Sequence, residues 1–354
     1  MSSSTLSKKQ IPQGYEFVQV SPHVACKRRR EARLDRRCEG TLSGRLEIRF
    51  LTEQPVHVGS GGKRLVNGEV VRSCMRIAGQ LGIPGSSLKG LLRARYEALT
   101  KSCVSVTKLK AHNKEKIRST TRVGYAQLLP SAIQGAAFHR CQVDPRAAMM
   151  CPACALFGCA GRESQRGRLT CSDLVLEAYA VPSGETTELA ELPAQFSPNL
   201  HHLGVARKSS PNSDAYFEVS TLHGRKFALS NSTATVSAPA PAPNAKKPKP
   251  FKVEVIPKNV WLTGTLIFQN LLPEELGGLL TALGCEPASY LKVGAGRALG
   301  FGRVKPELKS IELYDHQRHL VSMERATLRD HFVSWEDRWN EGEKQLITLH
   351  QGGC

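Results

Sequence analysis

Apolar and polar residues alternate along several short segments of the chain. Between residues 45 and 52, leucine, isoleucine and phenylalanine take every second position, and charged residues take most of the others. This period of two predicts a half-buried strand. Residues 174–179 and 261–268 show similar strand character. We therefore expect at least three strands, each with one face turned toward a core.

Two other segments show helical spacing. After a Pro-Gly turn, apolar residues recur at positions 88, 91, 92, 96 and 99, which predicts an amphipathic helix. Residues 273–283 carry four leucines on one face, and Gly284 follows where a C-cap glycine is expected. Both helices are long enough to cover one face of a sheet.

The elements follow the order of a β-α-β-β-α-β unit. We therefore expect an α+β fold of the ferredoxin-like (RRM-like) type, with two helices on one face of an antiparallel sheet. Common readers of single-stranded RNA share this architecture. The expected organisation is a basic N-terminal extension (1–43), one domain (44–310) with insertions at about 100–165 and 195–255, and a C-terminal tail (311–354).

The net charge of the chain favours a polyanionic partner. The chain has 49 Lys and Arg against 31 Asp and Glu, a formal charge of +18, which favours phosphate-rich partners through counterion release. No apolar run reaches the roughly 20 residues of a membrane-spanning helix, and the first ten residues lack a secretion signal. We expect a cytoplasmic protein that does not bind membranes. The seven cations of residues 26–38 form either a solvated charge run or a nucleic-acid-binding arm.

The start of the first helix could bind phosphate. Ser86 or Ser87 could cap the free backbone N–H groups, and Lys89 and Arg93 lie one turn apart near the positive end of the helix dipole. An ordinary capped helix with solvated cations explains the segment equally well. The pattern is not a P-loop, because its second glycine follows the lysine.

A second glycine-rich segment covers residues 292–304. Its glycines allow the backbone to approach a ligand closely, and Arg297 and Arg303 supply charge. The order helix, glycines, strand is the reverse of a dinucleotide-binding site. The alternative is a turn required by helix-to-strand packing.

A cysteine cluster predicts a structural metal site. Cys151 and Cys154 form a Cys-x-x-Cys pair, and Cys141 and Cys159 flank it at distances that could complete a tetrahedral Zn²⁺ site. His139 is the spare ligand. Unliganded buried cysteines are the alternative.

Residues 207–217 suggest a basic, aromatic hairpin. Arg207 and Lys208 precede Tyr216 and Phe217, a combination suited to contacting splayed bases, or simply an exposed turn. His57 lies in polar sequence, where a structural histidine is more common than a catalytic one.

Four motifs together resemble the RAMP superfamily, which includes the backbone subunits of type III CRISPR effector complexes. They are Val56–Gly59, Ile83–Gly90, Cys151–Gly158 and Gly294–Arg303, and residues 201–227 resemble the family's thumb hairpin. The resemblance implies a subunit that binds CRISPR RNA, polymerises along it and presents it to target RNA beside other effector subunits. It also implies the zinc-bearing form of the Cys-Pro-x-Cys element. The residues assigned to RNA binding are His57, Arg72, Ser86, Ser87, Lys89, Arg93, Arg95, Arg207, Lys208, Gly294, Gly296, Arg297, Gly300 and Arg303.

One departure from the family bears on cleavage. Members that cleave target RNA carry an aspartate between the first two motifs, whereas residues 60–72 contain none. Asn67 takes its expected place, and an amide cannot accept a proton as a carboxylate does. We therefore expect no catalytic residues here, with Glu69 and His57 as fallback candidates, and reliance on a separate nuclease subunit.

Two other functions stay open at this point. The chain could be a metal-independent endoribonuclease subunit of the same kind of complex, using Glu69 or His57. It could also be a zinc-ribbon protein that binds duplex DNA, which would explain the charge and the cysteines but leave both glycine motifs without a role.

Overall fold

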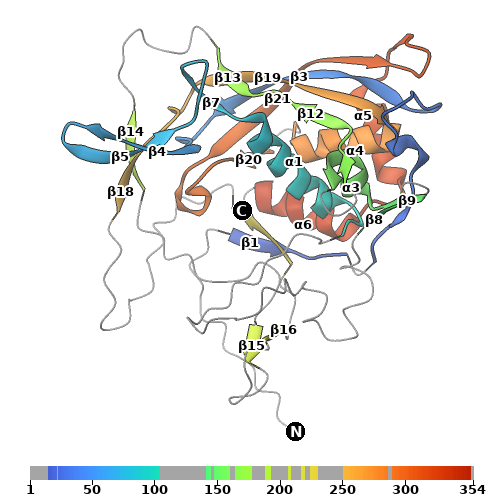
Figure 1. The fold of residues 1–354 in the computed structure, drawn as a ribbon, viewed down its shortest axis with the longest axis horizontal. Helices are drawn as coiled ribbons and strands as arrows, with labels where there is room; N and C mark the ends of the chain where they lie inside the picture. Colours follow the sequence, from blue (N-terminus) through green and yellow to red (C-terminus); the bar gives the residue numbers. More distant parts are fainter. Residues whose placement is uncertain are drawn as a thin grey trace.

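A curved antiparallel sheet spans the top of the molecule, with most of the helices beneath it (Figure 1). The computed structural model describes residues 15–21, 23–103, 141–144, 147–159, 164–177, 188–192, 206–208, 217–219, 224–229, 250–285 and 289–351.

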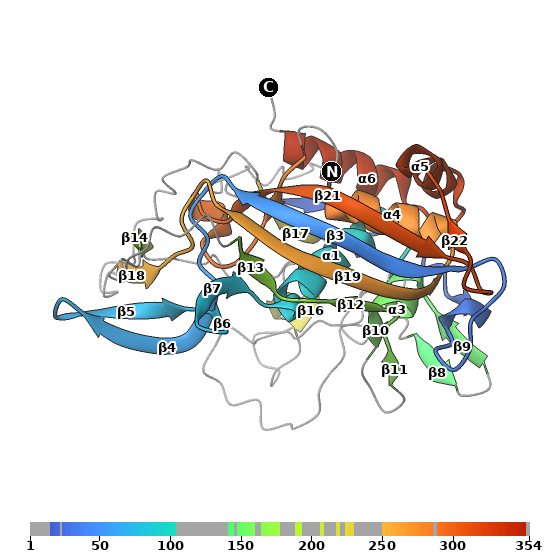
Figure 2. The ribbon, with the colours of Figure 1, turned by 90° about the horizontal axis from the view of Figure 1, so that it is seen from above.

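Three long strands form the centre of this sheet and lie side by side in Figure 2. They are β21 (Arg303–Tyr314), β3 (Leu42–Thr52) and β19 (Trp261–Leu271), with β3 in the middle. Shorter strands extend the sheet in the order β20-β21-β3-β19-β13-β7-β6, while β12 pairs with β19 and β22 with β21. Their bounds are β6 Arg76–Ile77, β7 Gln80–Ile83, β12 Leu169–Cys171, β13 Leu174–Leu176, β20 Leu291–Lys292 and β22 Leu320–Val321.

The predicted alternation decides which face of the sheet is buried. Leu46, Ile48 and Phe50 are completely buried, whereas Arg45 and Glu47 lie on the other face and pair with each other at 2.6 Å. The strands expected around 45–52 and 261–268 are therefore confirmed, and both extend further than the pattern indicated. The strand expected over 174–179 ends at Leu176, residues 178 and 179 lie outside the described residues, and two residues separate the strand from β12.

Helices α1 (Gly85–Leu99) and α4 (Pro273–Leu283) match the two predicted helices. Pro273 opens α4, where its missing N–H costs nothing, and Gly284 closes it in the left-handed conformation (φ 69°). The helix α3 (Pro152–Phe157) packs beside α1, with the Tyr96 and Phe157 rings edge to face at 5.6 Å. Two further helices, α5 (Arg325–Ser334) and α6 (Asn340–Gln351), contact α4 and α1 respectively. None of the described helices is both long and apolar enough to cross a membrane.

A hairpin at one end of the molecule covers the segment 60–72 in which no aspartate was found (Figures 1 and 2). Its strands β4 (Gly59–Val66) and β5 (Glu69–Cys74) join a second sheet of order β14-β18-β5-β4. Asn67 and Gly68 form its turn with φ 51° and 79°. The Asn-Gly pair favours this turn because both residues tolerate positive φ. The other strands are β14 (Leu189–Leu192) and β18 (Phe251–Glu254).

The described part of the basic N-terminal segment packs into the folded domain. β1 (Tyr15–Val18) pairs with β17 (Arg225–Ala228), and β2 (Lys27–Arg28) pairs with β9 (Ala147–Met150), which also pairs with β8 (Gln142–Asp144). Within this run, Arg29 is only 3% exposed and donates to Asp337 Oδ2 (2.7 Å). Arg29 is thus neither solvated nor available to nucleic acid, because it closes a buried ion pair. The single-turn η1 (Arg30–Ala32) follows.

The predicted C-terminal tail is also part of the folded body. The boundary at residue 310 falls within β21, and α5 and α6 follow it. Remaining short elements are β10 (Gly158–Cys159), β11 (Gln165–Arg166), β15 (Ala206–Lys208), β16 (Phe217–Val219) and η3 (Arg297–Leu299). The basic stretch 104–140 and the low-complexity stretch 230–249 lie outside the described residues.

Candidate functional site

The N-terminus of α1 is capped by a carboxylate from another part of the chain. The backbone N–H of Gly85 donates to Asp173 Oδ1 (2.7 Å), and neither Ser86 nor Ser87 caps the helix with its side chain. The expected serine cap is therefore wrong. Asp173 lies between β12 and β13, 88 residues away, so no local pattern could have indicated it. A carboxylate already takes the place near the helix dipole that a phosphate was expected to take.

The two cations predicted to grip phosphate are engaged within the protein. Lys89 Nζ donates to Leu169 O (2.7 Å) in β12. Arg93 donates to Gly158 O (2.8 Å) and to Glu97 Oε1 (2.9 Å). Both side chains therefore tie α1 to its neighbours on one side of the helix.

The glycine-rich segment folds back onto the residues that follow β3. The N–H of Ala295 donates to His57 O (2.8 Å), and the N–H of Gly302 donates to Pro55 O (2.9 Å). A Cβ on Gly294 (φ 78°) would lie only 2.3 Å from His57 O. Glycine is required at this position both by the backbone conformation and by the close approach.

Between this segment, α1 and β17 lies a pocket of about 330 Å³. The two glycine-bearing motifs, some 200 residues apart in the sequence, thus line one cavity. Among the described residues, those that line the pocket include four cations and no carboxylate. They are Ser87, Gly90, Leu91, Ala94 and Arg95 of α1, Lys226, Phe227 and Ala228 of β17, and Lys292, Val293, Gly294 and Arg297.

Two of these cations are deeply buried. Lys292 is 3% exposed and Arg95 is 4% exposed. Burial, assisted by the charges of Arg303 and Arg297, lowers the pKa of Lys292 to about 8. Burial alone lowers the pKa of Arg95 to about 10. A bound anion would relieve this cost, because an opposite charge stabilises the protonated form of each group.

Arg95, which lines the pocket, has one buried donor without a partner in the described part of the chain. Its Nε donates to Ala282 O (2.6 Å), but Nη1 has no hydrogen-bond partner among the described residues. In β17, the ammonium of Lys226 stacks on the Tyr15 ring (3.7 Å to the centroid). Burial and the charge of Arg297 lower the pKa of Lys226. The pocket is therefore suited to an anion that can accept several hydrogen bonds.

Of the residues assigned to RNA binding from the sequence, the pocket brings together Ser87, Arg95, Gly294 and Arg297. Lys226 and Lys292 were missed. Lys292 opens the glycine-rich segment and could have been included on that ground, whereas Lys226 becomes relevant only through the pairing of β17 with β1.

Other predicted RNA-binding residues lie elsewhere. Arg72 stacks on Phe251 (3.5 Å) in the second sheet, and Arg303 forms an ion pair with Glu53 (2.8 Å) and stacks on Tyr290 (3.6 Å). Gly296 and Gly300 flank η3 in the left-handed conformation, which shapes the loop. The backbone of Arg207 and Lys208 lies in β15, which pairs with β16 as the expected hairpin, but their side chains lie outside the described residues.

The two fallback catalytic residues, His57 and Glu69, both contact other residues of the protein. His57 is 4% exposed and its Nδ1 bonds to Glu254 O (2.7 Å). Glu69 lies beside the hairpin turn and forms an ion pair with Lys252. The two residues are thus engaged by different partners, and neither lines the cationic pocket.

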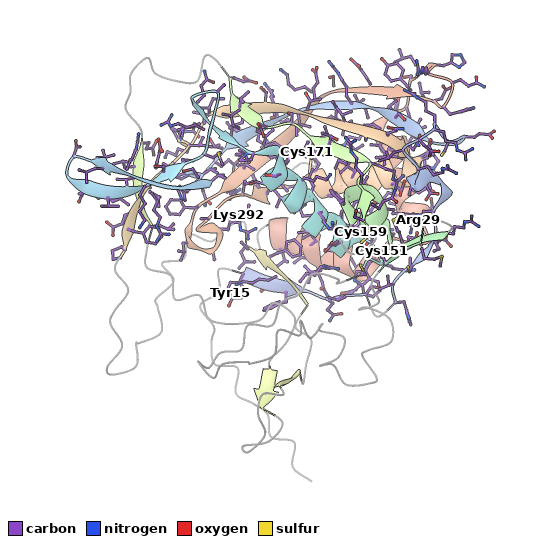
Figure 3. All side chains as sticks on the ribbon, in the orientation of Figure 1. Tyr15, Arg29, Cys151, Cys159, Cys171 and Lys292 are labelled. Atoms are coloured by element: carbon purple, nitrogen blue, oxygen red, sulfur yellow. The ribbon has the colours of Figure 1, made fainter. Side chains whose placement is uncertain are left out.

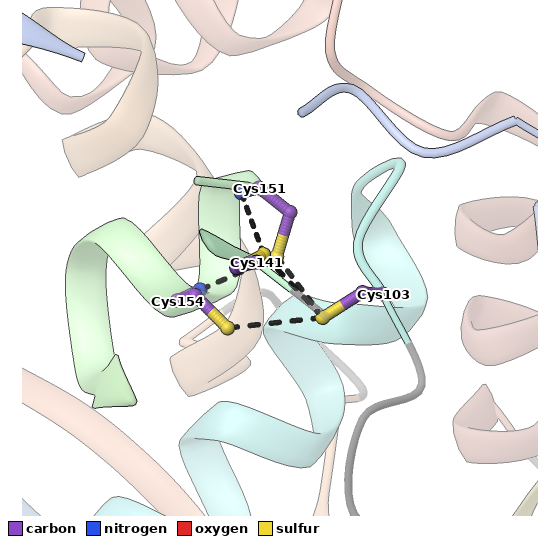
Figure 4. A group of neighbouring side chains, drawn as sticks. All are labelled: Cys103, Cys141, Cys151 and Cys154. Carbon is purple, nitrogen blue, oxygen red and sulfur yellow. Dashed lines mark hydrogen bonds between the residues drawn. The ribbon is translucent and has the colours of Figure 1, made fainter. Parts of the chain in front are cut away.

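Four cysteines gather around Cys151, which lies on the other side of α1 from Lys292 in the view of Figure 3. The sulfurs of Cys103, Cys141, Cys151 and Cys154 all lie within 4.8 Å of one another (Figure 4). Cys103 Sγ is 3.7 Å from Cys141 and Cys154 and 3.5 Å from Cys151. A tetrahedron with metal–sulfur bonds of about 2.3 Å has edges of about 3.8 Å, so these thiols could hold a metal ion.

Backbone and side-chain hydrogen bonds support the thiolate form. The N–H of Cys151 donates to Cys141 Sγ (3.1 Å), and the N–H of Cys154 donates to Cys151 Sγ (3.5 Å). Hydrogen bonding to Cys103 and Cys141 lowers the pKa of Cys151 well below its ordinary value, whereas hydrogen bonding within the cluster raises the pKa values of Cys141 and Cys154, so Cys151 is the thiol that ionises first. Thiolates are the form that binds metals.

The assignment of Cys159 to this cluster needs correction. Cys103 takes its place, because α3 carries the chain away from the cluster and Cys159 pairs with Gln165 in the β10–β11 hairpin. Cys103 lies shortly after the end of α1 and 48 residues before Cys151. The spacing of the cysteines around the Cys-x-x-Cys pair therefore gave no indication of it. The spare ligand His139 lies outside the described residues.

One of three comparisons with known proteins, the family model, agrees with the sequence motifs. A search of curated proteins found no match. Among solved structures, a chain described as "Type IV-B CRISPR Complex" is similar, with a TM-score of 0.35 and 16% identity, over 80% of this chain and 96% of that one. The family model of the RAMP superfamily matches residues 49–305, which include the cationic pocket and the cysteine cluster. The chain therefore belongs to the RAMP superfamily.

Proposed function

We propose that this protein is a CRISPR RNA-binding backbone subunit that oligomerises along the guide and presents it for pairing with target RNA. The observation that carries this proposal is the pocket between α1 and the glycine-rich segment. The described residues that line it include four cations and no carboxylate, and one of these cations, Arg95, has a buried N–H group without a partner. A chain of phosphodiesters supplies the negative charges and acceptor oxygens that such a pocket would bind.

The topology supports the same function. The strands β21, β3, β19 and β13 are neighbours in that order and pair antiparallel, and α1 and α4 connect them in the manner of a β-α-β-β-α-β unit. We infer a ferredoxin-like RNA-binding unit. Membership of the RAMP superfamily and the charge of +18 favour RNA as the polyanion.

We infer that this subunit does not cleave RNA itself. The position expected for a catalytic aspartate holds Asn67, whose positive φ fits a hairpin turn. Glu69 is neutralised by Lys252, and the His57 ring is held by a backbone carbonyl. Cleavage of the target would then fall to a separate nuclease subunit of the complex, which we expect to assemble in the cytoplasm.

We propose that the four thiols bind Zn²⁺. The S–S spacing and the N–H donors on sulfur fit a tetrahedral, four-thiolate site. Zinc would supply structural cross-linking rather than catalysis, because four protein ligands leave no open coordination position.

The direct test is to purify the full chain with its complex and sequence the bound RNA. We expect short RNAs of varied sequence that share one repeat-derived end. A preparation that carries no RNA, and that ignores CRISPR RNA at low salt, would overturn the proposal. Preference for duplex DNA in a competition assay would instead support the zinc-ribbon alternative.

Cleavage is tested on the assembled complex with matched target RNA in EDTA. We expect no regularly spaced cuts from this subunit. Cuts that persist in EDTA and disappear with Glu69→Gln would show that the subunit is a metal-independent nuclease.

A further inference from the structure

Arg93 connects the cysteine cluster to helix α1 through three nitrogens of its guanidinium group. Nη2 donates to Cys154 Sγ (3.6 Å), Nη1 to Gly158 O (2.8 Å), and Nε to Glu97 Oε1 (2.9 Å). Because the guanidinium is planar, these bonds together fix its position and orientation. A residue expected to grip phosphate thus contacts a cysteine of the cluster instead.

The connection continues through a second arginine. Glu97 also accepts from Arg225 Nη1 (2.5 Å) in β17, and Arg225 Nη2 donates to Cys103 O (3.1 Å). Arg93, Glu97 and Arg225 are mostly buried, with side-chain exposures of 26%, 16% and 12%. One network of three charged side chains therefore bonds to two of the four cysteines, Cys103 and Cys154.

Charge balance gives Arg93 a role at this site. Four thiolates around a divalent ion carry a net charge of −2, which is costly in a buried position unless cations or N–H donors offset it. Arg93 supplies both a positive charge and an N–H donor to Cys154. Groups that bond to metal ligands orient them and tune the affinity for the metal.

We propose that Arg93 is a positioning residue of the metal centre, which offsets the thiolate charge and orients Cys154. This inference rests on the proposed metal site. Removing such a group typically lowers metal affinity about 10- to 100-fold. Lysine at this position would keep the charge but lose the fork that reaches Cys154, Gly158 and Glu97 together, so its effect should be intermediate.

The test uses Co²⁺ as a spectroscopic probe on the full chain. The affinity of the wild type, Arg93→Gln and Arg93→Lys is measured by competition with a chelator, and the thiolate-to-cobalt absorption band is recorded. We expect at least a tenfold loss of affinity and a shifted band in Arg93→Gln, with a smaller loss in Arg93→Lys. Arg49→Gln is the matched control, because Arg49 bonds to Glu307 and stacks on Trp261; it should behave as the wild type.

The outcomes separate the two proposals. Wild-type affinity and an unshifted band in both Arg93 variants would overturn the role of Arg93 alone. A wild-type chain that takes up neither Co²⁺ nor Zn²⁺ would overturn the metal site and this role with it. If Arg93→Gln does not fold, the Arg93→Lys band and affinity decide, because that variant keeps the buried charge.

Discussion

The buried side chain of Lys292 makes the charge of the candidate RNA pocket depend on pH. Its ammonium donates to Gln54 Oε1 (2.7 Å) and to Phe301 O (3.1 Å), yet burial still lowers its pKa to about 8. Neutral acceptors replace only part of the hydration that a charged amine loses. Burying this charged amine destabilises the folded protein. A bound anion would offset that destabilisation.

Replacing Lys292 with methionine should change how stability depends on pH. The folded pKa of about 8 lies below the ordinary 10.5, so the unfolded chain binds more protons between these values. The wild type should therefore gain stability relative to Lys292→Met as pH rises from 8 to 10, by up to about 3 kcal/mol. Urea unfolding of both proteins at pH 7.5 and 10 measures this. Parallel changes in the two proteins would show that Lys292 is not the titrating group.

Arg297→Gln should weaken RNA binding with little dependence on sequence. Loss of one phosphate contact reduces the slope of log K against log salt by about 0.7 for a single strand. Fluorescence anisotropy over a salt series measures both the affinity and the slope. Lys305→Gln in β21 is the control, because Lys305 does not line the pocket. Equal effects of the two substitutions would mean that only overall charge matters.

At the scale of elements, the glycine-rich segment depends on close approaches at its glycines, and the approach at Gly294 reaches the residues that follow β3. Gly294 brings the backbone against His57 O, which joins this segment to the residues after β3. The hairpin turn offers a comparison, since Gly68 has nearly the same φ (79° against 78°) but open space around its absent side chain.

Gly294→Ala should therefore destabilise the protein more than Gly68→Ala. Both substitutions carry the cost of a positive φ, about 1 kcal/mol or more, but only the first adds a clash with backbone. Thermal unfolding gives the difference, and RNA affinity should fall only in Gly294→Ala. Equal losses of stability would argue against the close packing of this loop.

These elements show what local sequence could predict. The two main helices and the centre of the sheet follow from period and turn signals, because their core faces are set by neighbouring residues. The cap of α1 could not be predicted, since Asp173 reaches it from another strand. The helical period correctly places Lys89 and Arg93 on one face of α1. It could not show that this face contacts other parts of the protein and not the pocket, because those contacts come from distant segments.

At the scale of the whole molecule, the cysteine cluster joins segments that are far apart in the chain. Cys103 follows α1, Cys141 precedes β8, and Cys151 and Cys154 lie at the start of α3. A metal ion there would cross-link these segments and stabilise the folded state by binding it preferentially.

Cys103→Ser should abolish metal binding, whereas Cys159→Ser should leave it intact. Zinc content per chain and the unfolding temperature with and without chelator measure this. Metal at a thousand times its Kd contributes about 4 kcal/mol, so the chelator should lower the unfolding temperature of the wild type and of Cys159→Ser but not that of Cys103→Ser. The reverse pattern would restore the assignment made from spacing.

The sequence by itself determined the α+β class, the main helices, the central strands and the types of residue that we propose to bind phosphate and metal. These depend on periodicity and composition, which act over a few residues. Only the tertiary structure decided which cations face the pocket and which cysteine completes the cluster. The reason is that Lys226, Asp173 and Cys103 gain their roles from strand pairings and helix packing between segments that are distant in the chain.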